Sequence, residues 1–311
     1  MGRRSVHTKV RSRLGRWATP IATMLAMTSL AVPMGVLARD SPGVKVHLPP
    51  TAVAAAALPA HTTPLRIRAT VSRSLAPAAA LPSDGKWHLL SIGGGRRLAI
   101  TCQGTGTPTV ILEHGMGYGV DSGSWATVEK GVAKTTRACR YDRAFVGHSD
   151  DGASGRGLSN LAADLHALLK AAGIPAPYIL VGHSFGGLTV RYYALAYPED
   201  VVGMVQVDGS PPSVVPTLDL SSERLSRSKV LSQLKKLGGL GKMPLVVVTR
   251  GIGLSATWRA AQADLLELST RSRQVIATRS DHWIQLRQPD LVIAQIGTVI
   301  KTIRRRDDPD R

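Results

Sequence analysis

Short apolar runs alternate with helix-patterned segments between residues 86 and 303. The runs are rich in Val, Ile, Leu and Ala and are bounded by turn-forming residues, which is typical of buried strands. They lie at 110–112, 138–141, 178–181, 204–207, 245–248 and 274–277. Two earlier runs, 87–92 and 97–102, are separated by three glycines and predict an antiparallel hairpin. The alternation predicts an α/β domain with a mostly parallel, eight-stranded sheet flanked by helices.

Helical periodicity is clearest at 161–169 and 291–303. Ser159 or Asn160 is the expected N-cap of the first of these helices. The longest interval without a strand, about 209–243, has a helical pattern at 220–237. Such an interval is either a small lid over a binding site or an ordinary peripheral helix, and both interpretations stay open.

The first 85 residues do not share this pattern. Residues 1–38 contain six basic residues and no acidic one, and residues 17–37 carry no charge and lead to a small-residue cleavage pattern. This layout predicts a secretory signal peptide over 1–38, or a membrane anchor at 17–37 if the signal is not cleaved. Residues 39–85 are rich in Ala and Pro and predict a linker. We therefore expect an exported, periplasmic or extracellular protein whose folded domain spans 86–303, followed by a charged tail at 304–311.

Charge changes this interpretation little. The chain has 39 Lys and Arg against 21 Asp and Glu, a net charge of +18, of which +12 remains without residues 1–38. The remaining arginines are scattered, so nucleic-acid binding is not expected, although an anionic membrane or cell surface is a candidate partner. The nine histidines and two cysteines lack metal-ligand spacing, and no phosphate-binding or dinucleotide-binding motif is present. We expect neither a metal nor a cofactor.

A G-x-S-x-G sequence at 182–186 lies between the apolar run 178–181 and the helical run 188–197. In this strand-to-helix context, the serine occupies a tight turn at the carboxyl edge of the sheet, and its flanking glycines avoid a backbone clash. The start of the following helix favours negative charge at the same place. A glycine-rich turn without chemistry is the alternative, but the context favours Ser184 as a nucleophile.

A serine nucleophile needs a base, usually a histidine that a carboxylate orients. For a serine on such a turn, the acid and then the histidine follow later in the chain. Of nine histidines only His282 lies beyond Ser184, so His282 is the predicted base. Asp208 ends the run 204–207 and is the predicted acid, because no acidic residue follows the next strand between residues 249 and 258. The other acidic candidates are Asp264, Glu267 and Asp281.

Acyl transfer also needs donors for a developing oxyanion. The sequence Glu113-His114-Gly115-Met116-Gly117 follows the run 110–112 and supplies a glycine-containing loop beside the nucleophile. The backbone N–H groups of Met116 and Phe185 are the expected pair of donors. His114 itself is interpreted as structural.

Together these motifs resemble the α/β-hydrolase superfamily, and in particular its bacterial group related to prolyl iminopeptidases and carboxylesterases. The resemblance covers about two thirds of the chain. The matching motifs are the loop at 112–117, Tyr141-Asp142-Arg143-Ala144, the 182–187 turn, Tyr197-Pro198-Glu199, Val207-Asp208, and His282 with Gln288-Pro289-Asp290. Members commonly have a glycine and a tryptophan where this chain has Phe145 and His148, and we expect these two residues to line or support the entrance of the site.

The resemblance also implies a cysteine pairing. In the usual strand order of the superfamily, the strands that carry Cys102 and Cys139 are neighbours. An exported protein meets oxidising conditions, so we expect a Cys102–Cys139 disulfide, with two buried thiols as the alternative.

The function that the resemblance implies is serine hydrolysis of a small-molecule acyl substrate. Ser184 attacks the acyl carbon, His282 transfers the proton and Asp208 orients the imidazolium. A serine in place of the aspartate that dehalogenases and epoxide hydrolases use indicates esters, thioesters or amides. Cleavage of a carboxylic ester is the first expectation, and an amino- or iminopeptidase or an amidase is the second. A catalytically silent, envelope-associated binding protein is the alternative from another class.

Overall fold

The computed structural model describes residues 80–117 and 124–306 of the chain. The expected signal peptide or anchor at 1–38 lies outside the described residues, as do most of the expected linker and the last residues of the expected tail, 39–79 and 307–311. Within the described ranges, no helix is long and apolar enough to cross a membrane.

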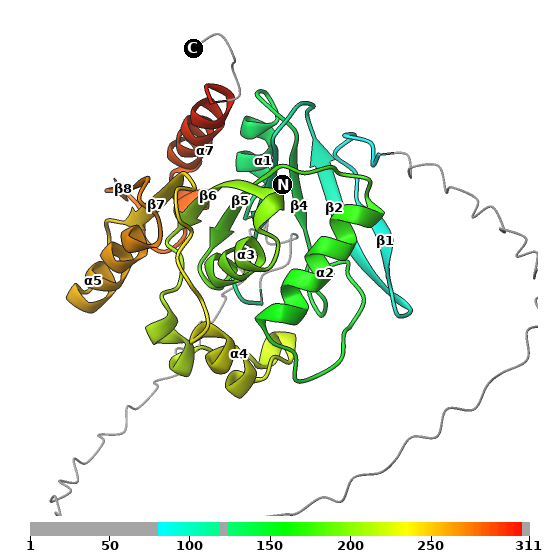
Figure 1. Ribbon diagram of the computed structural model, residues 1–311, viewed down its shortest axis with the longest axis horizontal. Helices are drawn as coiled ribbons and strands as arrows, with labels where there is room; N and C mark the ends of the chain where they lie inside the picture. The colour runs from blue at the N-terminus through cyan, green and yellow to red at the C-terminus, as the bar shows by residue number, and fades with distance from the viewer. Residues whose placement is uncertain (1–79, 118–123, 307–311) are drawn as a thin grey trace, which may run out of the picture. The chain divides into compact units, whose positions relative to one another are not determined.

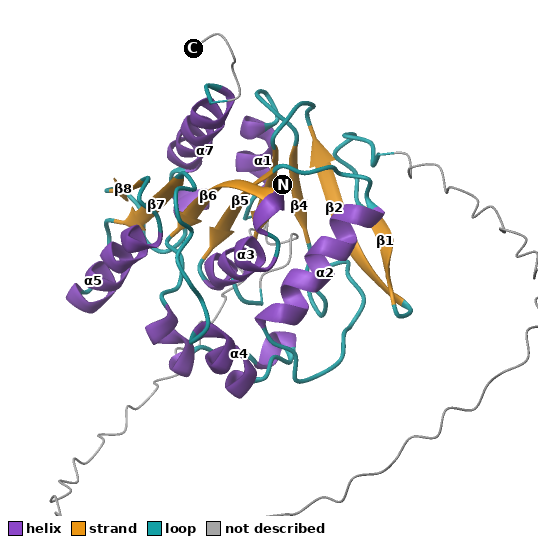
Figure 2. Cartoon of the chain, viewed as in Figure 1, coloured by secondary structure: helices purple, strands orange, loops and turns teal. Residues whose placement is uncertain are grey.

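An eight-stranded sheet forms the centre of the domain (Figures 1 and 2). Its strands are β1 His88–Gly93, β2 Arg96–Gln103, β3 Thr109–Glu113, β4 Ala138–Tyr141, β5 Tyr178–His183, β6 Val201–Val207, β7 Leu245–Arg250 and β8 Ser272–Ala277. They lie in the order β1-β2-β4-β3-β5-β6-β7-β8. β2 is antiparallel to β1 and β4, and the pairs from β4 to β8 are all parallel. The predicted eight-stranded, mostly parallel sheet is confirmed.

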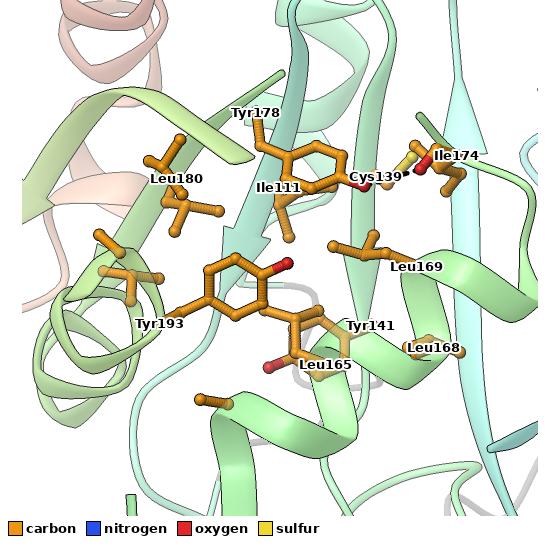
Figure 3. Close-up of a cluster of buried hydrophobic side chains, with 14 of the residues drawn as sticks. Ile111, Cys139, Tyr141, Leu165, Leu168, Leu169, Ile174, Tyr178, Leu180 and Tyr193 are labelled. Atoms are coloured by element: carbon orange, nitrogen blue, oxygen red, sulfur yellow. Dashed lines mark hydrogen bonds between the residues drawn. The ribbon is translucent and has the colours of Figure 1, made fainter. Parts of the chain in front are cut away.

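Helices cover both faces of the sheet. Side chains alternate between the two faces along each strand, so both faces carry apolar side chains that the helices bury. The helices are α1 Ala126–Val132, α2 Leu158–Ala171, α3 Phe185–Ala196, α4 Arg227–Leu234, α5 Ala256–Asp264, α6 Ile284–Arg287 and α7 Pro289–Arg304. On β5, Leu180 joins an apolar cluster with residues of α2 and α3, whereas Ile179 and Val181 join a second cluster with residues of α1 and α7. Figure 3 shows the first cluster, in which Leu165 and Tyr193 pack over the sheet.

The two cysteines lie directly opposite each other on neighbouring strands. The antiparallel register of β2 and β4 pairs Cys102 with Cys139. Their side chains are fully buried and form a disulfide. The structure therefore contains the expected pairing and not the alternative of two thiols.

The interval expected to hold one helix over 220–237 is organised differently. A 3-10 turn at Pro212–Thr217 and another at Ser221–Glu223 precede α4, which spans only Arg227–Leu234. Arg224 interrupts the helical pattern because its φ of +49° is left-handed. Ser226 then caps α4 by accepting the N–H of Lys229 at 3.3 Å. The prediction of a continuous helix was wrong in its extent.

Residues 212–237, which we call the cap, pack on the body of the domain. Val215, Leu220 and Val230 of the cap are buried in one cluster with Leu158 at the start of α2 and Phe185 at the start of α3. Figure 1 shows α4 beside the ends of these two helices. The cap therefore lies against the elements that surround the predicted nucleophile.

Two local boundaries also differ from expectation. α2 begins at Leu158, and its N-cap is Gly157 instead of Ser159 or Asn160. The Asn160 side chain still contributes, because its Oδ1 accepts the N–H of Gly157 at 3.0 Å. At the other side of the domain, Leu81 is buried, and its N–H donates to the carbonyl of Ala172 at 2.7 Å. The packed domain thus extends a few residues before β1.

Candidate active site

Ser184 occupies a strained turn between β5 and α3. Its φ of +52° and ψ of −124° lie in a region that residues other than glycine rarely adopt. Hydrogen bonds hold this conformation: the Ser184 N–H donates to the carbonyl of Val207 at 3.2 Å, and its own carbonyl accepts the N–H of Ser210 at 2.8 Å. The side chain is half-buried, so the hydroxyl remains accessible. This is the geometry that the G-x-S-x-G pattern predicts.

The glycines on either side of Ser184 are required by close backbone packing. A Cβ on Gly182 would lie 2.7 Å from the backbone nitrogen of Gly187. A Cβ on Gly186 would lie 2.8 Å from the carbonyl oxygen of Glu113, at the end of β3. Backbone atoms cannot move aside as a flexible side chain can, so an alanine at either position would displace the turn.

Asp208 and His282 are brought together although 74 residues separate them. Asp208 follows β6 and is fully buried. Its Oδ2 accepts the Nδ1–H of His282, which follows β8, at 2.6 Å. Its Oδ1 accepts the indole N–H of Trp258 at 3.0 Å and the backbone N–H of Arg250 at 3.3 Å. These bonds fix the carboxylate in one orientation, which in turn orients the imidazole.

The other acidic candidates lie elsewhere. Asp264 is the last residue of α5, and Glu267 belongs to a 3-10 turn that follows it. Asp281 precedes His282, and its carboxylate accepts the backbone N–H of Trp283 at 3.0 Å. Asp208 is the acidic candidate that hydrogen-bonds the imidazole of His282.

His183, the residue before the serine, holds the loop that carries His282. Its Nε2–H donates to the carbonyl of His282 at 2.9 Å, and the two rings lie 4.6 Å apart. Burial, together with the nearby His282, lowers the pKa of His183 to about 3. A neutral imidazole has one N–H, which this contact uses. This role of His183 leaves no signal in the sequence, because no spacing rule links it to His282.

Ser184 Oγ is hydrogen-bonded to Ser210 Oγ at 3.4 Å, and among the described residues no hydrogen bond joins it to the imidazole of His282. In enzymes without bound substrate, such catalytic hydrogen bonds are often long and tighten only when substrate binds. Ser210 follows Asp208 in the same loop and is buried. The loop after β6 therefore approaches both the nucleophile and the base.

The loop after β3 lies against the nucleophile. A Cβ on Gly115 would lie 3.4 Å from the Cβ of Ser184 and 3.0 Å from Nδ1 of His183. Met116 follows in this loop, and Phe185 is the first residue of α3. The two expected oxyanion donors thus belong to segments that adjoin Ser184.

A buried ionic network lies behind this loop, and sequence reasoning missed it. Arg143, which follows β4, forms ion pairs with Glu113 of β3 and Glu223 of the cap. The Tyr141 hydroxyl donates to the Glu113 carboxylate as well. All of these side chains are buried. Their positions in three separate segments leave no spacing signal in the sequence.

Phe145 and His148 support the loop that follows β4. Phe145 has a φ of +72°, which suits the glycine common at this position in similar proteins. Its ring lies between the guanidinium groups of Arg156 at 5.4 Å and Arg224 at 4.8 Å. His148 stacks on Trp87 with ring centroids 5.0 Å apart. Phe145 thus contacts the cap, whereas His148 packs next to the start of β1.

No group of three or more His, Cys, Asp or Glu side chains that could hold a metal occurs within 80–117 and 124–306. A serine on a strained strand-to-helix turn above a mostly parallel sheet, near a histidine paired with a carboxylate, defines the α/β-hydrolase class.

Comparisons with known proteins agree. The family model of the alpha/beta hydrolase fold matches residues 108–232. The uncharacterized protein YqjL of Bacillus subtilis is 28% identical over an alignment of 210 residues that covers 61% of this chain and 82% of YqjL. An AB hydrolase superfamily protein of Gibberella zeae is 28% identical over 135 residues, which are 42% of this chain and 41% of that relative, less than two thirds of its length. The solved enol-lactonase from Burkholderia xenovorans LB400 has a TM-score of 0.57 at 15% identity, covering 68% of this chain and 99% of that one.

The chain has the α/β-hydrolase fold, and its residues 108–232 match the family model of that fold. The resemblance inferred from its motifs is confirmed at this level. Its assignment to the group of prolyl iminopeptidases and carboxylesterases stays a prediction.

Proposed function

We propose that this protein is a serine hydrolase that cleaves a carboxylic ester, or a related acyl bond, through an acyl-enzyme on Ser184. The observation that carries the proposal is the 2.6 Å hydrogen bond between Asp208 and His282 beside a serine with a φ of +52°. The enol-lactonase structure supports an ester over an amide, because a lactone is a cyclic ester.

In the first half of the reaction, His282 takes the proton of Ser184 Oγ as this oxygen bonds to the acyl carbon. The carbonyl electrons move onto the acyl oxygen, which accepts hydrogen bonds from the N–H groups of Met116 and Phe185. The tetrahedral intermediate then collapses, the bond to the alcohol oxygen breaks, and His282 donates its proton to the leaving alcohol. A water molecule repeats the sequence on the acyl-enzyme, releasing the acid and restoring Ser184.

A fluorophosphonate probe tests the nucleophile directly. We expect the probe to label the native protein on Ser184, and to label neither Ser184→Ala nor His282→Asn when both variants retain the native unfolding temperature. Equal labelling of native protein and Ser184→Ala would contradict the proposal. A folded native protein without labelling would favour the silent binding protein.

The leaving group is tested with matched chromogenic substrates. A short p-nitrophenyl ester and the p-nitroanilide of the same acid differ only in the bond that is cleaved. An esterase hydrolyses the ester much faster than the anilide. Faster hydrolysis of the anilide would assign the protein to the peptidases or amidases instead.

We further propose that the domain acts outside the cytoplasm. The charge pattern of residues 1–38 and the buried Cys102–Cys139 disulfide support export, because such bonds persist in oxidising compartments. Amino-terminal sequencing of the protein from a cell fractionation should find a chain that starts after Ala38. A full-length chain in the membrane fraction would indicate an anchor, and a full-length soluble cytoplasmic chain would contradict export.

A further inference from the structure

The guanidinium group of Arg143 donates hydrogen bonds to two backbone carbonyl groups of the loop that follows β3. Its Nη1 donates to the His114 carbonyl at 2.8 Å, and its Nη2 donates to the Gly115 carbonyl at 2.9 Å. The same group is held by the carboxylates of Glu113 and Glu223, the latter at 2.7 Å from Nε and 2.5 Å from Nη2. A guanidinium is a rigid planar fork, so carboxylates that fix it also fix the two carbonyl groups it holds.

The direction of the Gly115 carbonyl determines the direction of the next N–H. This oxygen accepts from Arg143 Nη2 and also from the Nδ1–H of His114 at 2.7 Å. The Gly115–Met116 peptide is trans, so the Met116 N–H points opposite to the Gly115 carbonyl and away from Arg143. Gly115 itself packs against Ser184. The peptide is thus held with its N–H pointing away from Arg143, next to a glycine that adjoins Ser184.

His114 reinforces this orientation. Burial, together with the charge of Arg143, lowers the pKa of His114 to about 3. The neutral ring donates from Nδ1 to the Gly115 carbonyl and accepts the backbone N–H of Arg143 on Nε2 at 3.4 Å. Both ring nitrogens are therefore used in holding the loop.

The cap completes the arrangement through Glu223. This side chain is fully buried, and its Oε1 accepts the N–H of Gly117 at 2.9 Å as well as the bond from Arg143. Burial alone would raise the pKa of Glu223, but the charge and hydrogen bonds of Arg143 outweigh burial and lower it. Glu223 is therefore a carboxylate at neutral pH. A residue of the cap thus touches the loop that carries Met116.

We propose that Arg143 and Glu223 are positioning residues that lock the Gly115–Met116 peptide with the Met116 N–H facing Ser184. In this arrangement the cap contributes Glu223 to the support of the oxyanion site, in addition to covering the domain. A peptide released from the lock can rotate and withdraw its N–H, while the pocket that binds the rest of the substrate keeps its shape. The inference rests on the proposed serine-hydrolase function.

The substitution Glu223→Gln tests the lock. It keeps the shape of the side chain but removes one of the two carboxylate charges that hold Arg143. The matched control is Glu129→Gln, which neutralises another fully buried glutamate, one that pairs with Arg140 at 2.6 Å. If Glu223→Gln does not fold, Glu223→Asp replaces it, because this change keeps the charge and withdraws the carboxylate by one methylene.

The readouts separate positioning from general stability. Stopped-flow acylation by a p-nitrophenyl ester should be at least tenfold slower in Glu223→Gln, since loss of one oxyanion donor costs about 10²- to 10³-fold in kcat. The affinity for a trifluoromethyl ketone, which forms an oxyanion on the serine, should fall in parallel. The substrate dissociation constant should stay within about twofold of native. Glu129→Gln should keep native values of all three, even if its unfolding temperature falls.

Two kinds of failure are distinguishable. A native enzyme that is acylated on Ser184, together with a folded Glu223→Gln of native acylation rate and ketone affinity, would overturn the lock and leave the serine hydrolase intact. Equal losses in Glu223→Gln and Glu129→Gln would also overturn it, because they would indicate a general effect of buried charge. A native enzyme that is never acylated would overturn the proposed function and this inference with it.

Discussion

Two residues of the candidate site have left-handed backbone conformations, Ser184 with a φ of +52° and Asp208 with a φ of +43°. Such conformations cost about 1–3 kcal/mol each and persist only where surrounding contacts impose them. Here the N–H groups of both residues bond to the sheet, that of Ser184 to Val207 and that of Asp208 to Val248 at 2.7 Å. Hydrogen bonds to carbonyl groups at the ends of the central strands thus offset the conformational cost at Ser184 and Asp208.

Trp258 donates a hydrogen bond to the acid, and we expect the substitution Trp258→Phe to slow acylation roughly tenfold or more. A hydrogen bond to a charged group is worth about 1.5–3 kcal/mol, and without it Asp208 orients His282 less well. Stopped-flow kinetics with a p-nitrophenyl ester measures the change. The control Trp87→Phe alters a ring that stacks on His148, and its acylation rate should equal that of the native protein. Equal rates in all three proteins would show that the indole N–H is dispensable.

Two buried histidines predict acid sensitivity. Burial lowers the pKa of His114 and His183 to about 3, from 6.5 in an unfolded chain. Between these pH values the unfolded chain binds more protons, so the free energy of unfolding falls as the pH falls below about 6.5. The slope is about 1 kcal/mol per pH unit for each histidine. Urea unfolding from pH 7 to pH 5 measures this slope, and His114→Gln should reduce it. A stability that does not change over this range would refute the assignment.

At the scale of the elements, chain order made the central site predictable. Ser184, Asp208 and His282 each follow a strand, and in a parallel sheet the carboxyl ends of the strands meet at one edge. Arg143 and Glu223 were not predictable, because 80 residues separate them and their contact depends on how the cap folds back. Only the extent of the helix in the cap differs from the prediction, since periodicity does not register the left-handed Arg224 that interrupts the helical pattern.

Alanine substitutions at two helix glycines, Gly186 and Gly297, should change the stability of the protein in opposite directions. In α3, Gly186→Ala would place a Cβ 2.8 Å from the Glu113 carbonyl, so we expect a loss of about 1–3 kcal/mol of stability and much slower acylation. In α7, a Cβ on Gly297 would meet nothing within 4 Å. Gly297→Ala should therefore stabilise the protein by about 0.5–1 kcal/mol with unchanged kinetics. Chemical denaturation and ester hydrolysis measure both variants, and a fully active Gly186→Ala would contradict the close packing.

At the scale of the whole molecule, the disulfide joins the antiparallel edge of the sheet to its parallel centre. It closes a loop of 37 residues, which predicts a stabilisation of about 4 kcal/mol through the unfolded state. The double variant Cys102→Ala with Cys139→Ala should thus unfold at a clearly lower temperature in calorimetry. Its kinetics should be native, because the bond joins β2 to β4, whereas Ser184, Asp208 and His282 follow β5, β6 and β8. An unchanged unfolding temperature would show that the bond does not constrain the chain.

The central claim is that Ser184 carries the acyl group during turnover. The most direct measurement is peptide mass spectrometry of protein that is mixed with a p-nitrophenyl ester and quenched in acid within milliseconds. We expect one acyl adduct per chain, on the peptide that contains Ser184, with a burst of p-nitrophenol of equal amplitude. An adduct on another residue, or steady hydrolysis with neither burst nor adduct at Ser184, would contradict it.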